Sequence, residues 1–466
     1  MNGSVIVGAQ GMANNAHIPV EDIALVSQGE SLADMSRLVF CDPNHFRTGE
    51  LHRHTPRWLS LLNDLNDDRF SEVHDWITNG VDAFILLPHE KEKFIRLVKE
   101  ILPRDCSDLL TLQRLSDKCT SISLAAPGAR LYVNEINLAV SGATRSSRPV
   151  KMSPALKKEI EHWLFLESWD GFLPWRSEKH THVKLFCDSS HVAWGGALSP
   201  NAIEVNVYDY WDASAIQADI ATKETLALNN VLESFADSIK NSWVDAFVDS
   251  MVLVLSWTRQ GSRSHLLSDA LKKLFSTITK LVIDLHLTFV PSFQNQADPP
   301  SRRLTLQDTK LCPSLWVVVQ ELYGGEDGHS VDLMARPSNA QSDLSGAQLP
   351  FFSETLLPGS LGVNVFAQSP DLYDVSIFKN FYVFPPISLI PHAIQYLRSL
   401  QLSYTIVIPD VCPRHFWRPL LTSTCSARHL SAIAGTVGAL LTPSRNGFSN
   451  HWPIPLDLWV FRTGQE

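Results

Sequence analysis

The spacing of hydrophobic residues changes along the chain, from a helical period before residue 181 to a strand period after it. Four early stretches place a hydrophobic residue at every third or fourth position, which predicts helices; they are 51–84, 90–101, 110–125 and 152–169. Ser153 and Pro154 suit the N-cap and first position of the last helix. We therefore expect 46–180 to be mainly helical, after a weakly patterned tail at 1–45.

Alternation of hydrophobic and polar residues begins at residue 182 and predicts β-strands. In the segment 182–188, odd-numbered residues fall on one face of the strand and even-numbered residues on the other. The order that follows is strand, strand, strand, helix, strand, helix, strand. The first helix begins near Ile220 and has Glu224 on its hydrophobic stripe. This order predicts an α/β domain at 181–305.

Four acidic residues stand at the ends of these predicted elements. Asp188 ends the first strand, Glu224 lies in the first helix, Asp249 ends the fourth strand, and Asp298 follows the fifth. In an open sheet with helical crossovers, the ends of neighbouring strands meet at one edge, where ligands bind. Carboxylate oxygens suit Mg²⁺, and a pair of such ions supports phosphodiester cleavage. The pattern therefore predicts a metal site for hydrolysis.

Each acid alone has a simpler interpretation. An Asp at a strand end is more often a turn or cap residue than a metal ligand, which applies to Asp249 and to Asp298 before two prolines. Glu224 is harder to explain in that way, because a carboxylate on a hydrophobic stripe is costly to bury without a partner. The joint occurrence of all four acids in this order favours the metal site.

The segments that carry the acids resemble a known family. CDSSHVAWGGAL, ATKETLAL, FVDS and FQNQADPPSR resemble the four ribonuclease H motifs of retroelement polyproteins, in particular the DIRS/Ngaro group of tyrosine-recombinase retrotransposons. Two positions depart from the pattern: Ala193 stands where Gly is common, and Pro300 where Leu is usual.

The resemblance implies a fold and a site. The fold is a ribonuclease H-like mixed five-stranded sheet with flanking helices. The catalytic residues are Asp188, Glu224, Asp249 and Asp298, all four of which hold the metal, and the cofactor is Mg²⁺ or Mn²⁺.

The flanking segments carry the resemblance further. Residues 46–180 resemble a remnant of a polymerase N-terminus, thumb and connection, but the palm and its paired aspartates are missing, so we expect no reverse transcriptase activity. A linker at 306–350 and a C-terminal α/β segment at 351–466 follow. The latter resembles a degenerate adenine-N6 DNA methyltransferase. Phe384 precedes two prolines where that enzyme has a polar residue, so we expect this segment to be inactive.

Composition limits the possible partners. Lys and Arg number 39 and Asp and Glu 49, a formal net charge of −10, so a nucleic-acid surface must be a local patch. Ser190, Arg259, Arg263 and Arg302 are the candidates for nucleic-acid contacts, although each is individually more typical of a solvated surface group. Seven cysteines without a CxxC pair indicate neither a disulfide scaffold nor a zinc site.

Two functions of different class fit these observations. One is a metal-dependent endonuclease that cleaves the RNA strand of RNA–DNA hybrids, whose minor groove displays 2′-hydroxyls. The other is a non-catalytic, retroelement-derived protein that binds nucleic acid or serves as a scaffold. In both cases we expect an intracellular protein, cytoplasmic or nuclear, without a membrane partner, because no hydrophobic run is long enough to cross a bilayer.

Overall fold

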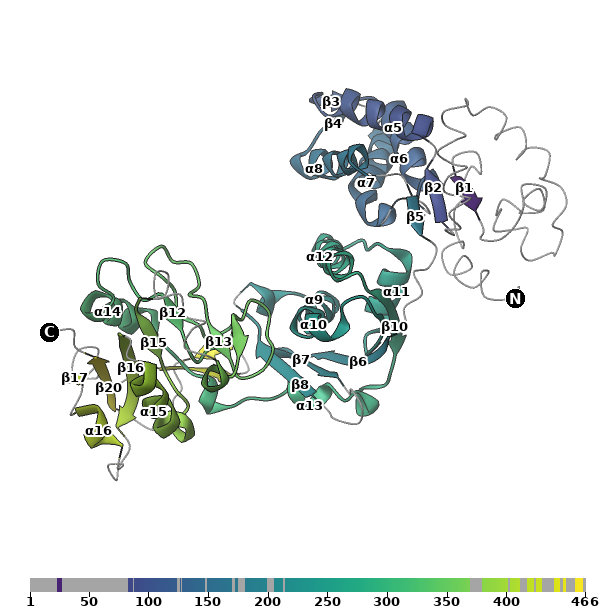
Figure 1. The fold of residues 1–466 in the computed structure, drawn as a ribbon. Coiled ribbons are helices and arrows are strands. Elements are labelled where there is room, and N and C mark those ends of the chain that lie inside the picture. Colours follow the sequence, from purple (N-terminus) through teal and green to yellow (C-terminus); the bar gives the residue numbers. More distant parts are fainter. Residues whose placement is uncertain are drawn as a thin grey trace. The chain divides into compact units, whose positions relative to one another are not determined.

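The structure of the protein is a computed structural model. It describes residues 23–26, 83–86, 88–123, 126, 128–146, 149–169, 172–174, 181–198, 205–212, 214–368, 379–400, 403–410, 417–422, 425–429, 440–444, 447–449 and 457–463. These residues form two compact units (Figure 1), one from Met1–His180 with Val254–Phe275 and one from Thr181–Leu253 with Ser276–Glu466. Within the described part of the chain, no helix has the length and hydrophobicity needed to cross a membrane.

The first unit is mainly helical where it is described, as the hydrophobic spacing predicts. Its elements are β1 Ile23–Val26, β2 Ala83–Leu86, α5 Pro88–Ile101, β3 Cys106–Ser107, α6 Leu109–Ser121, α7 Asn134–Ser146, β4 Val150–Lys151, α8 Pro154–His162 and β5 Phe172–Pro174. The Ser153 hydroxyl caps α8 by accepting from the Leu156 N–H at 3.2 Å. Strand β1 lies inside the predicted tail, and β2 takes the last residues of the predicted helical stretch 51–84, whose remainder lies outside the described residues.

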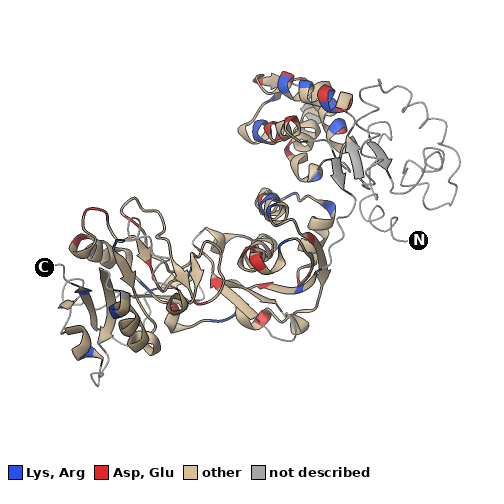
Figure 2. Cartoon of the chain, in the orientation of Figure 1, with Lys and Arg blue, Asp and Glu red and all other residues tan. Residues whose placement is uncertain are grey.

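Charged residues of both signs are interspersed along α5 and α8 (Figure 2), and a few of them are buried. The Glu90 carboxylate accepts from Lys93 at 2.8 Å and from Lys118 at 2.6 Å. Glu159 is almost fully buried, and its Oε1 accepts from the first N–H groups of α7, at Glu135 and Ile136. These pairs hold the helices together beside a hydrophobic core.

The second unit contains the mixed five-stranded sheet expected of a ribonuclease H-like domain. The elements of this sheet and its helices are β6 His182–Ser189, β7 Ala193–Leu198, β8 Val205–Tyr210, α9 Ile220–Ser234, α10 Ala236–Ile239, β9 Trp243–Val248, α11 Met251–Arg259, α12 His265–Leu281, β10 Asp284–Phe289 and α13 Asp298–Ser301. Most of α11 and the first part of α12, within Val254–Phe275, belong to the first unit. The strand order is β10-β9-β6-β7-β8. The pairs β10–β9 and β9–β6 are parallel, and β6–β7 and β7–β8 are antiparallel. The predicted order of strands and of helical crossovers is confirmed, and each crossover contains a second helix, α10 or α11, that the prediction did not include.

Strand β7 is packed closely on both faces because it carries two successive glycines. A Cβ on Gly195 would lie 2.5 Å from the Ser301 backbone nitrogen in α13. A Cβ on Gly196 would lie 2.4 Å from a methyl group of Val231 in α9. Both distances are shorter than any tolerable contact, so the absence of side chains lets both helices approach the strand.

A second α/β region, built around its own five-stranded sheet, forms the C-terminal part of this unit. Its elements are β11 Lys310–Leu311, α14 Pro313–Tyr323, β12 Val331–Asp332, β13 Phe352–Ser353, β14 Gly362–Val363, β15 Phe381–Val383, α15 Ile390–Leu400, β16 Tyr404–Asp410, α16 Arg418–Thr422, β17 Cys425–His429, β18 Leu440–Ser444, β19 Gly447–Ser449 and β20 Asp457–Thr463. The sheet order is β12-β15-β16-β20-β17, and its first three strands are parallel.

The stretch 306–350, predicted to be a linker, has secondary structure of its own. It contains α14, whose residues Leu315, Trp316 and Val319 are buried in a core with Tyr382 of β15. The remaining domain limits stay predictions.

Candidate metal centre

Three acidic residues converge because their elements are neighbours in the sheet. Strands β6 and β9 are parallel, with Cys187 opposite Val248, so the next residues, Asp188 and Asp249, emerge side by side at the same strand ends. Helix α9 packs on this sheet and begins at Asp219, whose carboxylate caps it by accepting from the Thr222 N–H at 3.0 Å. Glu224 follows one turn later.

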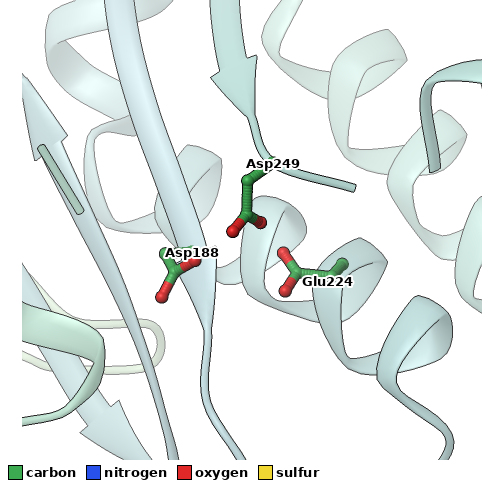
Figure 3. Close-up of side chains that lie close together, drawn as sticks. All are labelled: Asp188, Glu224 and Asp249. Carbon is green, nitrogen blue, oxygen red and sulfur yellow. The ribbon is translucent and has the colours of Figure 1, made fainter. Parts of the chain in front are cut away.

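The carboxylates of Asp188, Glu224 and Asp249 each offer an oxygen, and these three oxygens lie within 4.8 Å of one another. Figure 3 shows the three side chains pointing toward a common point. Asp188 and Glu224 are buried, at 2% and 3% exposed, and Asp249 is half-buried. The position of Glu224 on the hydrophobic stripe of α9 thus places its carboxylate beside the two aspartates and away from solvent.

Burial and mutual repulsion disfavour negative charge at this cluster. Burial raises the pKa of Glu224 to about 9, and the charges of Asp188 and Asp249 act in the same direction. Burial also raises the pKa of Asp188 to about 6, against the lowering effect of a hydrogen bond from Ser301. One Glu224 oxygen, Oε2, is buried without a hydrogen-bond partner among the described residues. An all-oxygen, anionic set with such an unsatisfied atom fits a hard divalent cation.

Asp298 is not among the three acids whose oxygens lie within 4.8 Å of one another, although its charge raises the pKa of Asp188. Its Oδ1 accepts from Arg302 Nη2 at 2.7 Å and Nε at 2.8 Å. The reason is local: Asp298 is the first residue of the one-turn helix α13, and a residue four positions later in the chain reaches back to it.

The four predicted nucleic-acid contacts are placed differently from one another. The Ser190 hydroxyl is used internally, since it donates to the Ser301 carbonyl at 2.7 Å and accepts from the Ala193 N–H at 3.0 Å. Arg302 is exposed but paired with Asp298. Arg259 and Arg263 are exposed and belong to the first unit. Their contacts with nucleic acid stay predictions.

Two residues of the site, Lys223 and Ser292, were not predicted from the sequence. Lys223 precedes Glu224, yet its side chain is buried, and its Nζ donates to the carbonyls of His191 at 3.0 Å and Ile216 at 2.8 Å. Ser292 donates to Asp249. A lysine beside a site acid is a weak signal, and the serine lies 43 positions from its partner, so no local pattern marks it.

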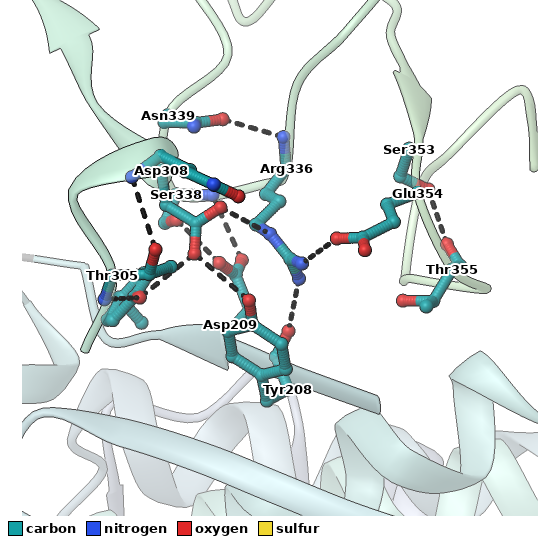
Figure 4. A network of polar contacts seen from close by, with 12 residues as sticks. Tyr208, Asp209, Thr305, Asp308, Arg336, Ser338, Asn339, Ser353, Glu354 and Thr355 are labelled. Atoms are coloured by element: carbon teal, nitrogen blue, oxygen red, sulfur yellow. Dashed lines mark hydrogen bonds and ion pairs between the residues drawn. The ribbon is translucent and has the colours of Figure 1, made fainter. Parts of the chain in front are cut away.

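A second buried polar cluster lies on β8, an edge strand of the same sheet (Figure 4). Arg336 is 4% exposed and donates to Asp308 at 3.1 Å, to Glu354 at 2.7 Å and to the Tyr208 carbonyl at 2.8 Å. The hydroxyls of Tyr208 and Tyr210 donate to the same Asp308, at 3.1 and 2.9 Å.

Next to this cluster, Asp209 of β8 is buried and accepts from the Ser338 N–H at 3.0 Å and hydroxyl at 2.5 Å. These groups satisfy one another, and Arg336 compensates the charges of Asp308 and Glu354, so we interpret them as an interface between β8 and residues 306–354.

No protein-family model matches the chain, and no curated protein matches it. Among solved structures, it is similar to ribonuclease H1 from Halobacterium salinarum, with 20% identity, 26% of this chain and 92% of that chain covered, and a TM-score of 0.22. It is also similar to LC11 ribonuclease H1 in complex with RNA/DNA hybrid, with 14% identity, 26% of this chain and 91% of that chain covered, and a TM-score of 0.21. The foamy viral protease–reverse transcriptase in complex with RNA/DNA hybrid is similar as well, with 13% identity, 50% of this chain and 31% of that chain covered, and a TM-score of 0.20.

Proposed function

We propose that this chain is a divalent-metal-dependent endonuclease that cleaves the RNA strand of RNA–DNA hybrids, and that it derives from a retroelement of the DIRS/Ngaro type. The observation that carries the proposal is the Glu224 carboxylate, buried without a partner for Oε2 among the described residues and within 4.8 Å of two other acids. Such a group is costly unless a cation or a proton compensates it. The ribonuclease H motifs around the acids support the substrate class.

In this proposal Asp188, Glu224 and Asp249 hold Mg²⁺ or Mn²⁺. When bound, such ions stabilise the charge that develops on the phosphate oxygens and activate water. The protein positions the ions through rigid elements, two strand ends and one helix, and Lys223 fixes the start of that helix to the turn after β6.

Asp298 takes the role of fourth ligand only if it exchanges its partner. In the described structure it is bound to Arg302, which is 62% exposed. Release of Asp298 frees the guanidinium for a phosphate oxygen of the substrate, a bidentate contact that Arg favours.

The experiment is cleavage of a hybrid whose RNA strand is labelled, in Mg²⁺ or Mn²⁺, by the full chain and by Asp188→Asn. Asp237→Asn is the matched control, because Asp237 is an exposed acid in α10 and the charge change is the same. We expect metal-dependent cleavage by the parent and the control and its loss in Asp188→Asn. Equal cleavage by Asp188→Asn and the parent contradicts the proposal.

A non-catalytic, nucleic-acid-binding role is the second candidate. The pairing of Asp298 with Arg302 and the internal use of the Ser190 hydroxyl favour it, because both remove groups from a working site. Hybrid binding by the parent without any cleavage in either metal supports this role.

A further inference from the structure

The two strand-end aspartates of the metal centre each accept a hydrogen bond from a serine, and both serines belong to one ten-residue segment. The Ser292 hydroxyl donates to Asp249 Oδ2, and the Ser301 hydroxyl donates to Asp188 Oδ2. This segment, 292–301, follows β10 and ends with α13. Glu224 receives no side-chain donor from it, in keeping with its unpartnered Oε2.

The segment is itself fixed to β6 and to the turn that follows β6. The Asn295 side chain donates to the Cys187 carbonyl at 2.8 Å, and its own Oδ1 accepts from the Ala297 N–H at 3.1 Å. At the far end, Ser190 donates to the Ser301 carbonyl at 2.7 Å. The segment is therefore anchored at Asn295 and at Ser301, which limits where its two hydroxyl groups can lie relative to the acids.

A hydroxyl donor on one oxygen of a carboxylate sets the rotation of the whole group. Each serine donates to Oδ2, so Oδ1 of each aspartate receives no hydrogen bond from these two hydroxyls. Carboxylates that bind metals are usually held by hydrogen bonds of this kind, and loss of such a partner typically lowers metal affinity by about 10–100-fold.

We propose that Ser292 and Ser301 are positioning residues of the metal centre, which orient Asp249 and Asp188 for the ions. This inference rests on the proposed metal site but not on cleavage. Ser292 acts from an exposed position and Ser301 from a fully buried one. Substitution of the two serines should therefore affect folding stability differently. Metal affinity should fall to a similar extent in both cases.

The test is a titration of the full chain with MgCl₂ alone, followed by thermal unfolding, for the parent and for Ser292→Ala and Ser301→Ala. Ligands that prefer the native state raise the melting temperature in a concentration-dependent way. We expect the Mg²⁺ concentration at half-maximal stabilisation to rise by about tenfold in each alanine variant. Hybrid cleavage should return toward the parent rate at saturating Mg²⁺.

Two further variants separate positioning from packing. Ser292→Thr keeps a hydroxyl at an exposed position and should restore the parent midpoint. Ser189→Ala removes a buried serine that is adjacent to Asp188 but donates only to the Ser190 carbonyl, and it should also keep the parent midpoint.

The outcomes distinguish this inference from the proposed nuclease function. Midpoints within about twofold of the parent in both alanine variants overturn the positioning role, whatever their melting temperatures without metal. If the alanine variants have shifted midpoints but the parent does not cleave hybrid, the positioning role is supported and the nuclease function is overturned. A parent that Mg²⁺ does not stabilise overturns both.

Discussion

Asp249 directly follows β9 and lies beside two other acids, and this position determines what a substitution there does. Like charges within 4.8 Å repel one another, so loss of one favours the folded protein when no cation is bound. The same loss removes an anionic oxygen from the candidate metal site. Stability and activity should therefore respond in opposite directions at this residue.

Asp249→Asn should abolish most hybrid cleavage while the metal-free melting temperature stays the same or rises. We expect at least about a 100-fold fall in rate, since a bound cation supplies several kcal/mol of charge stabilisation in the transition state. Single-turnover cleavage and thermal unfolding of the same preparation measure both quantities.

A capping role for Asp249 gives a different result. Asn caps a helix about as well as Asp, so neither quantity would change. The structure gives the cap of α11 to Ser250 instead, whose hydroxyl accepts from the Leu253 N–H at 3.3 Å. Undiminished cleavage by Asp249→Asn would contradict the metal-ligand role.

At the scale of elements, β7 is held between α13 and α9 through Gly195 and Gly196, and the two contacts differ in kind. The atom that a Cβ would meet belongs to the backbone at Gly195 and to a side chain at Gly196. Alanine at either position should destabilise the protein by about 1–3 kcal/mol. Only the second effect should be relieved by Val231→Ala, and a double-mutant cycle in urea measures this coupling.

A glycine in open space provides the control for these variants. A Cβ on Gly142, in α7, would contact nothing within 4 Å beyond its own helix, so Gly142→Ala should be neutral or stabilise by up to about 1 kcal/mol. Equal coupling of Val231→Ala to both β7 glycines would show that the two faces are not independent.

Helix α5 offers a prediction about pH. Burial raises the pKa of Glu90, but hydrogen bonds from Lys118 and Lys93 outweigh it and bring the pKa down to about 2 from 4.5. Glu90 thus stabilises the fold above pH 4.5, and this contribution is lost as the pH falls from 4.5 toward 2.

The variant Glu90→Gln should therefore be less stable than the parent at neutral pH, by about 1–2 kcal/mol, because solvent screens the half-exposed Lys93. The difference should shrink as urea unfolding is repeated down to about pH 3. Glu100→Gln is the control, since its ion pair with Arg104 is exposed. A difference that does not depend on pH would assign the effect of Glu90 to packing.

Local periodicity predicted the longer helices and strands well, but it does not predict side-chain contacts between residues far apart in the sequence. The alternation in 182–188 located β6, and Ser153 marked the start of α8 because a cap is a property of neighbouring residues. The strands at 331–332 and 352–353 are two residues long, which is too short for any period. The contact between Ser292 and Asp249 joins residues 43 positions apart, so it depends on the folded backbone.

At the scale of the whole molecule, Arg336 joins the β8 edge of the sheet to the segment after it. Arg336→Met should destabilise the second unit by about 3–5 kcal/mol, because it leaves Asp308 buried without its cation. Hybrid cleavage should fall with the folded fraction. Denaturant unfolding followed by tryptophan fluorescence measures the loss.

Lys379→Met is the matched control, because it breaks an ion pair with Asp327 whose two side chains are 64% and 82% exposed. Exposed pairs contribute about 0–1 kcal/mol. If the two variants were equally stable, the buried cluster on β8 would not hold the two segments together.

The same cluster has a consequence for inheritance. Asp209 of β8 is buried, and its donors come from the other segment, at the N–H and hydroxyl of Ser338. A recombination event that joined the sheet to a foreign C-terminal segment would leave this carboxylate unpaired, at several kcal/mol in a protein whose total stability is about 5–15 kcal/mol. Descendants of this chain should therefore keep both segments together or lose both.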